Sequence, residues 1–214
     1  MKQDLFSKWN DNQDTHYAVL GMSGLGKTFI SLMLKRLKNW THYSVDYEIG
    51  KILFTDENKR FLEGFSIDNL SNLSLFLGKP GDKKRGGITF AEYVKRQRLH
   101  REAEIVSTLN SCKAATNAHG KNFICDTSGS ICEIVDPTDP EDKILTAISK
   151  KFLIICLEAD NDIHETLIQR FKSSPKPMFY QEEFLRNLWK SYLLSVNKNE
   201  TRVDPDDFIL YGYK

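Results

Sequence analysis

Residues 16–28 read HYAVLGMSGLGKT, and the rest of the fold follows from this stretch. Residues 17–20 form an apolar run that predicts a buried strand. Residues 21–28 fit the pattern G-x-x-x-x-G-K-[ST] of a loop that cradles phosphate groups. A helix to about Lys38 is predicted next, with an apolar face made of Phe29, Ile30, Met33, Leu34 and Leu37.

The glycine loop carries the chemistry of a nucleoside triphosphate site. Glycines let the backbone turn tightly, and the loop's N–H groups and the following helix N-terminus attract phosphate oxygens. Lys27 is expected to reach the β- and γ-phosphates, and the Thr28 hydroxyl is expected to bind Mg²⁺. The alternative is a glycine-rich turn that binds nothing. The predicted cofactors are ATP and Mg²⁺, and the predicted nucleotide-binding residues are Gly21, Met22, Ser23, Gly24, Leu25, Gly26, Lys27, Thr28 and Phe29.

The composition bounds the class of protein. A chain of 214 residues with 40% hydrophobic residues suits one α/β domain with an inserted lid. Lysine and arginine total 30 against 29 aspartate and glutamate residues, so the net charge of +1 gives no argument for a nucleic-acid or membrane partner.

The four cysteines show no C-x-x-C spacing, which argues against a zinc site, and nothing indicates disulfides. The N-terminus lacks the apolar core of a signal peptide, and no apolar run is long enough to cross a bilayer. We therefore expect a soluble, reduced, cytoplasmic protein that opens with a polar lead-in over residues 1–15.

Two further strands are predicted to end at an acidic residue. Residues 42–45 are followed by Asp46, and residues 122–125 are followed by Asp126. Parallel strands carry ligands at their carboxyl ends, so Asp46 is expected at the ligand-binding edge. The alternative for Asp46 is a helix cap for residues 47–53. Asp126 matches the Walker B pattern, whose carboxylate holds Mg²⁺, usually through water.

The remaining chain favours an α/β fold. Residues 152–157 are a continuous apolar run, typical of a parallel strand buried on both faces. With it the chain has four predicted strands that alternate with helices, so we expect a parallel, three-layer sheet. The Ser-Gly-Ser turn at 128–130 permits close backbone approach to a bound substrate.

A long helix is predicted from Thr89, and its charged residues, Arg101 and Glu104 among them, are expected mostly on the surface. The basic run at 78–87, GKPGDKKRGG, could hold an anionic substrate, although a solvated surface is the favoured interpretation. The apolar positions expected along the helix are Tyr93, Val94, Leu99, Ile105, Val106 and Leu109.

Four blocks of this sequence resemble the shikimate kinase-type members of the P-loop small-molecule kinases. They are similar to that family's P-loop, its D-x-D-x-E-I strand end, its R-x-x-E helix and its G-G-G-S turn. The helix at 165–170 and the segment at 176–179 resemble the family's lid helix and lid. The four blocks here are GMSGLGKT at 21–28, DYEI at 46–49, REAE at 101–104 and TSGS at 127–130.

The resemblance implies roles for residues that would meet the substrate. Asp46 would grip the substrate's hydroxyl groups and act in catalysis. Arg101 would hold a substrate carboxylate, while Ser128 and Gly129 would contact the substrate from the turn.

The resemblance also implies roles beside the nucleotide. Arg170 would lie by the ATP phosphates and act in catalysis together with Lys27. Ser44 stands where the family has an aspartate near Mg²⁺, and Asp126 is expected to compensate for that loss.

The implied fold is one P-loop NTPase domain over residues 1–214, with a central parallel sheet, an insertion at about 54–100 and a lid at about 172–181. The implied activity is transfer of the ATP γ-phosphoryl group to a hydroxyl of a small metabolite, with a shikimate-like acceptor as one candidate. One alternative is a P-loop ATPase or nucleotide-binding regulatory module. Another is a nucleotide or nucleic-acid-end kinase that uses the basic stretch 79–101. The oligomeric state stays open.

Overall fold

A computed structural model describes residues 15–37, 40–118 and 122–213. The predicted polar lead-in, except for Thr15, and the predicted helix end at Lys38 lie outside this part. The chain divides into two compact units. The first unit draws on Met1–Glu48 and Glu104–Glu158, and the second draws on Ile49–Ala103 and Ala159–Lys214.

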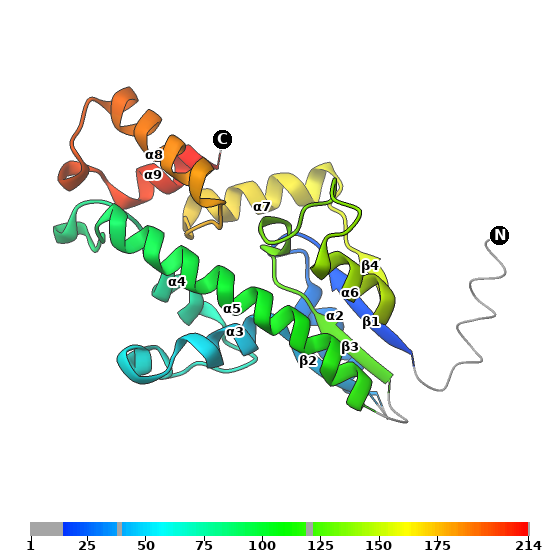
Figure 1. The fold of residues 1–214 in the computed structure, drawn as a ribbon. Coiled ribbons are helices and arrows are strands. Elements are labelled where there is room, and N and C mark those ends of the chain that lie inside the picture. Colours follow the sequence, from blue (N-terminus) through cyan, green and yellow to red (C-terminus); the bar gives the residue numbers. More distant parts are fainter. Residues whose placement is uncertain (1–14, 38–39, 119–121, 214) are drawn as a thin grey trace. The chain divides into compact units, whose positions relative to one another are not determined.

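The first unit is a parallel sheet with helices (Figure 1). Its strands are β1 (His16–Leu20), β2 (Trp40–Ser44), β3 (Asn122–Asp126) and β4 (Leu153–Cys156). Its helices are α2 (Lys27–Lys35), α6 (Lys143–Lys151), the first residues of α3 (Val45–Leu53) and the C-terminal part of α5 (Phe90–Asn117). The predicted α/β class with four parallel strands is confirmed.

The strand order β2-β3-β1-β4 explains where a site can form. The chain leaves β1 through α2 toward β2 on one side, and it leaves β3 through α6 toward β4 on the other side. Neighbouring strands β1 and β3 therefore send their connections in opposite directions. Such a switch point opens a crevice at the carboxyl ends of the strands, which is where ligands bind in open α/β sheets.

Helices lie on both faces of this sheet. Trp40 of β2 and Leu34 of α2 pack in one apolar cluster, and the Trp40 ring stacks on Tyr17 of β1 at 5.5 Å. Tyr43 lies three positions after Trp40 and so points to the opposite face. Its hydroxyl donates to the carbonyl oxygen of Ser107 in α5 at 2.9 Å. Thus α2 covers one face and α5 covers the other.

The prediction that residues 152–157 form a strand buried on both faces is wrong. The strand exists as β4, but within the described residues it pairs only with β1, and so it stands at the edge of the sheet. Leu153 is 41% exposed and Ile154 is 37% exposed. An apolar run predicts a strand, but the order of the strands decides whether both faces of that strand are covered.

The second unit is helical. Its helices are α4 (Ser71–Leu77), α7 (Asn161–Ser173), α8 (Glu182–Val196), α9 (Pro205–Gly212) and the N-terminal part of α5, with 3₁₀ helices at Asp56–Phe61, Lys83–Arg85 and Glu200–Arg202. Aromatic side chains fill its core: Phe90 stacks on Trp189 at 4.8 Å, and Trp189 meets Phe208 edge-on at 4.7 Å. The predicted insertion at about 54–100 falls wholly within this unit. The extent of a single domain over 1–214 stays a prediction.

The second half of the predicted lid is held against α5. Tyr93 and Gln97 both donate to the carbonyl oxygen of Met178, at 3.2 and 3.0 Å. The Phe179 ring is buried and lies 4.3 Å from the His100 ring. We name residues 178–180 the strap. The strap is part of the packed unit, so a movable lid could involve only the residues before it.

The basic run at 78–87 is partly neutralised. Lys79 pairs with Asp206 at 2.5 Å, and Arg85 pairs with Asp204 at 2.5 Å. Asp204 is the N-cap of α9, where the helix dipole also stabilises a negative charge. These pairs attach the run to the start of α9, which fits a surface role better than a role in holding anions.

The predicted apolar positions of α5 are only partly right: Tyr93 and Val94 are buried, but two others are exposed. Leu99 is 36% exposed and Val106 is 48% exposed, whereas Gln97, Glu104 and Ser111 are buried. The helix therefore turns polar side chains inward. Across the part of the chain with assigned positions, no helix is both long and apolar enough to cross a membrane.

The core of the second unit can be tested on α8. Leu185 is fully buried and Leu194 of the same helix is 75% exposed. Leu185→Ala should lower the free energy of unfolding by about 2–5 kcal/mol, since it leaves a cavity. Leu194→Ala, the matched control, should change it by less than about 0.5 kcal/mol. Urea denaturation followed by circular dichroism measures both, and equal losses would contradict this packing.

Candidate functional site

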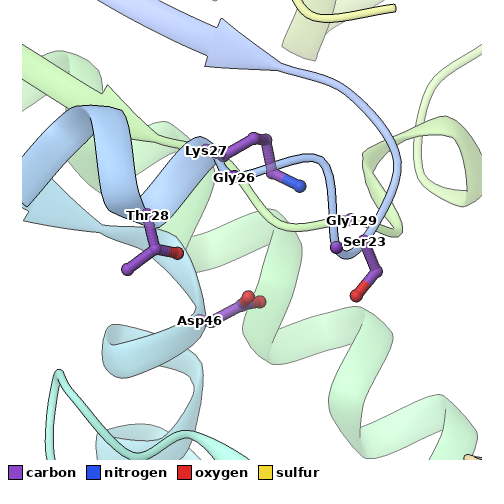
Figure 2. A pocket seen from close by; sticks show the side chains of 7 residues that line it. Ser23, Gly26, Lys27, Thr28, Asp46 and Gly129 are labelled. Atoms are coloured by element: carbon purple, nitrogen blue, oxygen red, sulfur yellow. The ribbon is translucent and has the colours of Figure 1, made fainter. Parts of the chain in front are cut away.

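A cavity of about 260 Å³ opens in the first unit at the switch point of the sheet. Figure 2 shows the Thr28 hydroxyl and the Asp46 carboxylate turned toward the same space beside the glycine loop. The lining residues are Ser23, Gly24, Gly26, Lys27, Thr28, Asp46 and Gly129, all of them predicted site residues. They follow strands β1, β2 and β3, whose carboxyl ends meet here.

The loop needs glycine at defined positions. Gly26 immediately precedes α2 and has φ of 90°, a conformation that L side chains rarely adopt. Gly21 has φ of 150°, and a Cβ atom there would lie 2.9 Å from the carbonyl oxygen of Leu157. The loop thus passes directly against the segment that follows β4.

Lys27 is the first residue of α2 and is only 7% exposed. Its Nζ donates to the carbonyl oxygens of Gly21 and Met22, at 2.8 and 3.1 Å. Burial lowers the pKa of Lys27, while the nearby charges of Asp46 and Asp126 act to raise it. The ammonium group therefore folds back over the loop and lies in the field of two carboxyl groups.

The outer side chains of the loop face solvent. Met22 is 49% exposed and Phe29 is 68% exposed. A role for these two residues in nucleotide binding would therefore come from their backbone N–H groups. Leu25 instead turns inward, with its Cδ1 atom close to Gly21.

Asp46 lies in the first turn of α3, because β2 ends at Ser44. The helix-cap alternative for Asp46 is wrong. Ser44 provides the capping type of bond, since its Oγ accepts from the Tyr47 N–H at 3.3 Å. The pKa of Asp46 is raised to about 7, first by burial and then by the charge of Asp126, while Lys27 acts to lower it.

Asp126 ends β3 and is 3% exposed. Its Oδ2 lies 3.8 Å from Nε2 of His42, which comes from β2. Its Oδ1 has no hydrogen-bond partner among the described residues. The predicted magnesium ligand is therefore a buried carboxylate that does not itself line the cavity and has one oxygen without a partner among the described residues.

The sequence analysis placed Glu104 on the surface, and this prediction is wrong. Glu104 is fully buried in α5 and accepts hydrogen bonds from the hydroxyls of Ser128 and Ser130, the latter at 2.8 Å. Burial raises its pKa to about 7; the two serines act against this shift, and Asp46 and Glu133 repel the charged form. The R-x-x-E block was the signal that could have marked Glu104 as a site residue.

Glu104 fixes the turn that follows β3. The turn is also tied to the sheet, because Thr127 Oγ1 donates to the Val19 carbonyl oxygen at 2.8 Å. Gly129 lies against the glycine loop, where an added Cβ would be 3.0 Å from Ser23 Cβ. The Ser128 hydroxyl is engaged by Glu104, so Gly129 is the residue of this turn that lines the cavity.

Arg101 and Arg170 belong to the second unit, and their surroundings are those of that unit. Arg101 donates from NH2 to the strap at the Tyr180 carbonyl oxygen, at 3.0 Å. Arg170 is exposed near the end of α7. Their predicted roles in substrate and nucleotide binding stay predictions.

The donors at the cavity fit a metal that is shared with a bound phosphate. The described residues hold no group of three or more His, Cys, Asp or Glu side chains arranged to bind a metal. Mg²⁺ does not require one, because it keeps several waters and binds through one or two carboxylates plus phosphate oxygens. The Thr28 hydroxyl lines the cavity. The unpartnered oxygen of Asp126, which is buried and outside the lining, is of the same ligand type.

A scan against models of protein families gave no match to this chain, and a search of curated proteins gave none either. The geometry of this cavity is therefore what supports a function for the chain.

Glu104 predicts a pH dependence of stability. Its pKa is raised from 4.5 to about 7 on folding, so its contribution is present below pH 4.5 and is lost as the pH rises through 7. Across this range the loss is on the order of 3 kcal/mol. Glu104→Gln, whose amide can accept from one serine hydroxyl and donate to the other, should reduce this slope in urea denaturation between pH 4.5 and 7.5. The raised pKa of Asp46 contributes the slope that remains. Glu102→Gln on the exposed side of α5 is the control, and parallel curves for all three proteins would refute the assignment.

Gly129 predicts a steric coupling to the glycine loop. Gly129→Ala should lower the free energy of unfolding by about 1–3 kcal/mol, because the new methyl group meets Ser23 at 3.0–3.2 Å. Ser23→Gly removes the nearest atom, so the double variant should recover part of the loss. A double-mutant cycle in urea gives the coupling, and strictly additive effects would mean that the two segments do not touch.

Proposed function

We propose that this chain is a phosphotransferase of the P-loop kinase type, which transfers the γ-phosphoryl group of ATP to a hydroxyl of a small metabolite. One observation carries the proposal. The glycine loop, Lys27, Thr28 and Asp46 line one cavity at the switch point of a parallel sheet. A cavity of about 260 Å³ is just below the roughly 300–1,000 Å³ of ligand pockets, and it suits the phosphate end of a nucleotide.

In this proposal the glycine loop and Lys27 bind the phosphate groups. The N–H groups of the loop and of the first turn of α2 provide fixed partial positive charge. Lys27 leaves the carbonyl oxygens of Gly21 and Met22 and moves to the phosphate oxygens. In phosphoryl transfer the protein acts mainly by positioning the phosphate groups and by stabilising their charge, and Lys27 would do both.

Thr28 and Asp126 would hold Mg²⁺ together with the phosphates. The ion neutralises charge on the phosphate oxygens. The unpartnered oxygen of Asp126 and the place of Thr28 in the lining of the cavity support this assignment.

Asp46 is the proposed base. Its raised pKa, about 7, suits a group that exchanges a proton near neutral pH. The acceptor hydroxyl oxygen bonds to the γ-phosphorus, its proton passes to Asp46, and ADP leaves with the electrons of the broken P–O bond.

The proposed roles of Arg101 and Arg170 are contacts with a substrate carboxylate and with the ATP phosphates, respectively. Because α5 holds the strap through the Met178 carbonyl, we assign the closing movement of the proposed lid to residues 172–177. ATP and a small-molecule acceptor are the proposed partners, without nucleic acid or membrane, and the proposed location is cytoplasmic.

A second candidate is an ATPase or a nucleotide-binding regulatory module without kinase activity. Ser44 favours it. The related kinases have an aspartate there, but this Ser44 is buried and its hydroxyl accepts from the Tyr47 N–H. The site would then have one carboxylate fewer beside the metal.

The test is ADP release from MgATP by the full chain, alone and with shikimate, polyol acids and nucleosides. One acceptor should stimulate release, and Lys27→Ala should reduce the stimulated rate by about 10² or more. Slow release that no acceptor changes, and that Lys27→Ala abolishes, would favour the ATPase. Wild type that neither binds ATP nor releases ADP would overturn both candidates.

A further inference from the structure

His42 has a buried side chain whose ring nitrogens make no hydrogen bond within the described residues. Its side chain is 0% exposed, and neither ring nitrogen has a hydrogen-bond partner among the described residues. Its Nε2 faces Oδ2 of Asp126 at 3.8 Å, which is too long for a hydrogen bond.

The sheet brings these two side chains to the same face. Strands β2 and β3 are parallel, with His42 beside Ile124 and Ser44 beside Asp126. Side chains two positions apart on a strand point to one face, so His42 and Asp126 are diagonal neighbours. The pairing register of β2 and β3 therefore places the His42 ring next to the Asp126 carboxylate.

The same face carries a further unused polar group. Helix α2 packs on β2 and β3, and its fully buried Ser31 has a hydroxyl without a partner among the described residues. Ser31 lies one turn after Lys27 and Thr28. Near the glycine loop the layer between α2 and the sheet is therefore polar, while farther away the stacked rings of Tyr17 and Trp40 make it apolar.

Such an arrangement costs stability. A buried polar group without a partner loses its hydration and gains nothing in return, so an apolar side chain of similar volume would suit the fold better. Buried groups of this kind call for a specific explanation. The position of His42 beside the proposed metal ligand provides one.

We propose that His42 is a positioning residue for Asp126. A shift of about 1 Å brings Nε2–H to hydrogen-bonding distance of Oδ2. That bond fixes the carboxylate and leaves Oδ1 for the metal. That bond needs only a hydrogen on Nε2. The inference rests on the proposed function, because it takes Asp126 as a magnesium ligand.

The test uses the full chain with His42→Leu, His42→Gln and the control Ser31→Ala. The measured quantities are the Kd of ADP by calorimetry, with saturating Mg²⁺ and with EDTA, and the midpoint of urea unfolding. His42→Leu should unfold at the same or a higher urea concentration, because it removes unsatisfied nitrogens. Its Kd should rise about tenfold with Mg²⁺ and stay unchanged with EDTA.

His42→Gln places an amide N–H near the position of Nε2, so its Kd with Mg²⁺ should return to within about threefold of wild type. Ser31→Ala should leave both Kd values unchanged. A His42→Leu variant that loses stability, or whose Kd rises equally in both conditions, would make His42 a structural residue and overturn the inference alone. Wild type that does not bind ADP would overturn the proposed function, and the inference with it.

Discussion

The charge balance under the glycine loop is the constraint on which the rest of the site depends. The Lys27 ammonium lies in the field of Asp46 and Asp126, while burial acts against the charged forms of Lys27 and Asp46. These groups come from the ends of β1, β2 and β3, so the strand order β2-β3-β1-β4 is what makes the balance possible. A different order would separate the Lys27 ammonium from these two carboxyl groups.

The sequence predicted the local part of this arrangement well. The strand, glycine loop and helix around residues 16–35 are set by short-range rules, and the structure has all three. The apolar run at 152–157 shows where prediction from the sequence fails. Its composition is that of a buried central strand, yet β4 stands at an edge of the described sheet, because neighbour order depends on connections between distant segments.

Helix α5 shows a second limit. Hydrophobic periodicity assumes that apolar side chains turn inward, whereas this helix buries Gln97, Glu104 and Ser111. The partners of Glu104 are Ser128 and Ser130, 24 and 26 positions later in the chain, and no periodic pattern indicates such a pair. The predicted residues that gather in the cavity come from local motifs, and the missed ones depend on partners from another element.

Lys27 has one more consequence for ligand affinity. Its ammonium already has two acceptors, the carbonyl oxygens of Gly21 and Met22, within its own loop. Any anion that enters the cavity must compete with them, and as part of the same chain they are present at a high effective concentration. Binding is then an exchange of partners. The net free energy of anion binding is the difference between two sets of hydrogen bonds. When the anion leaves, the two carbonyl oxygens can accept from Lys27 again, which favours its release.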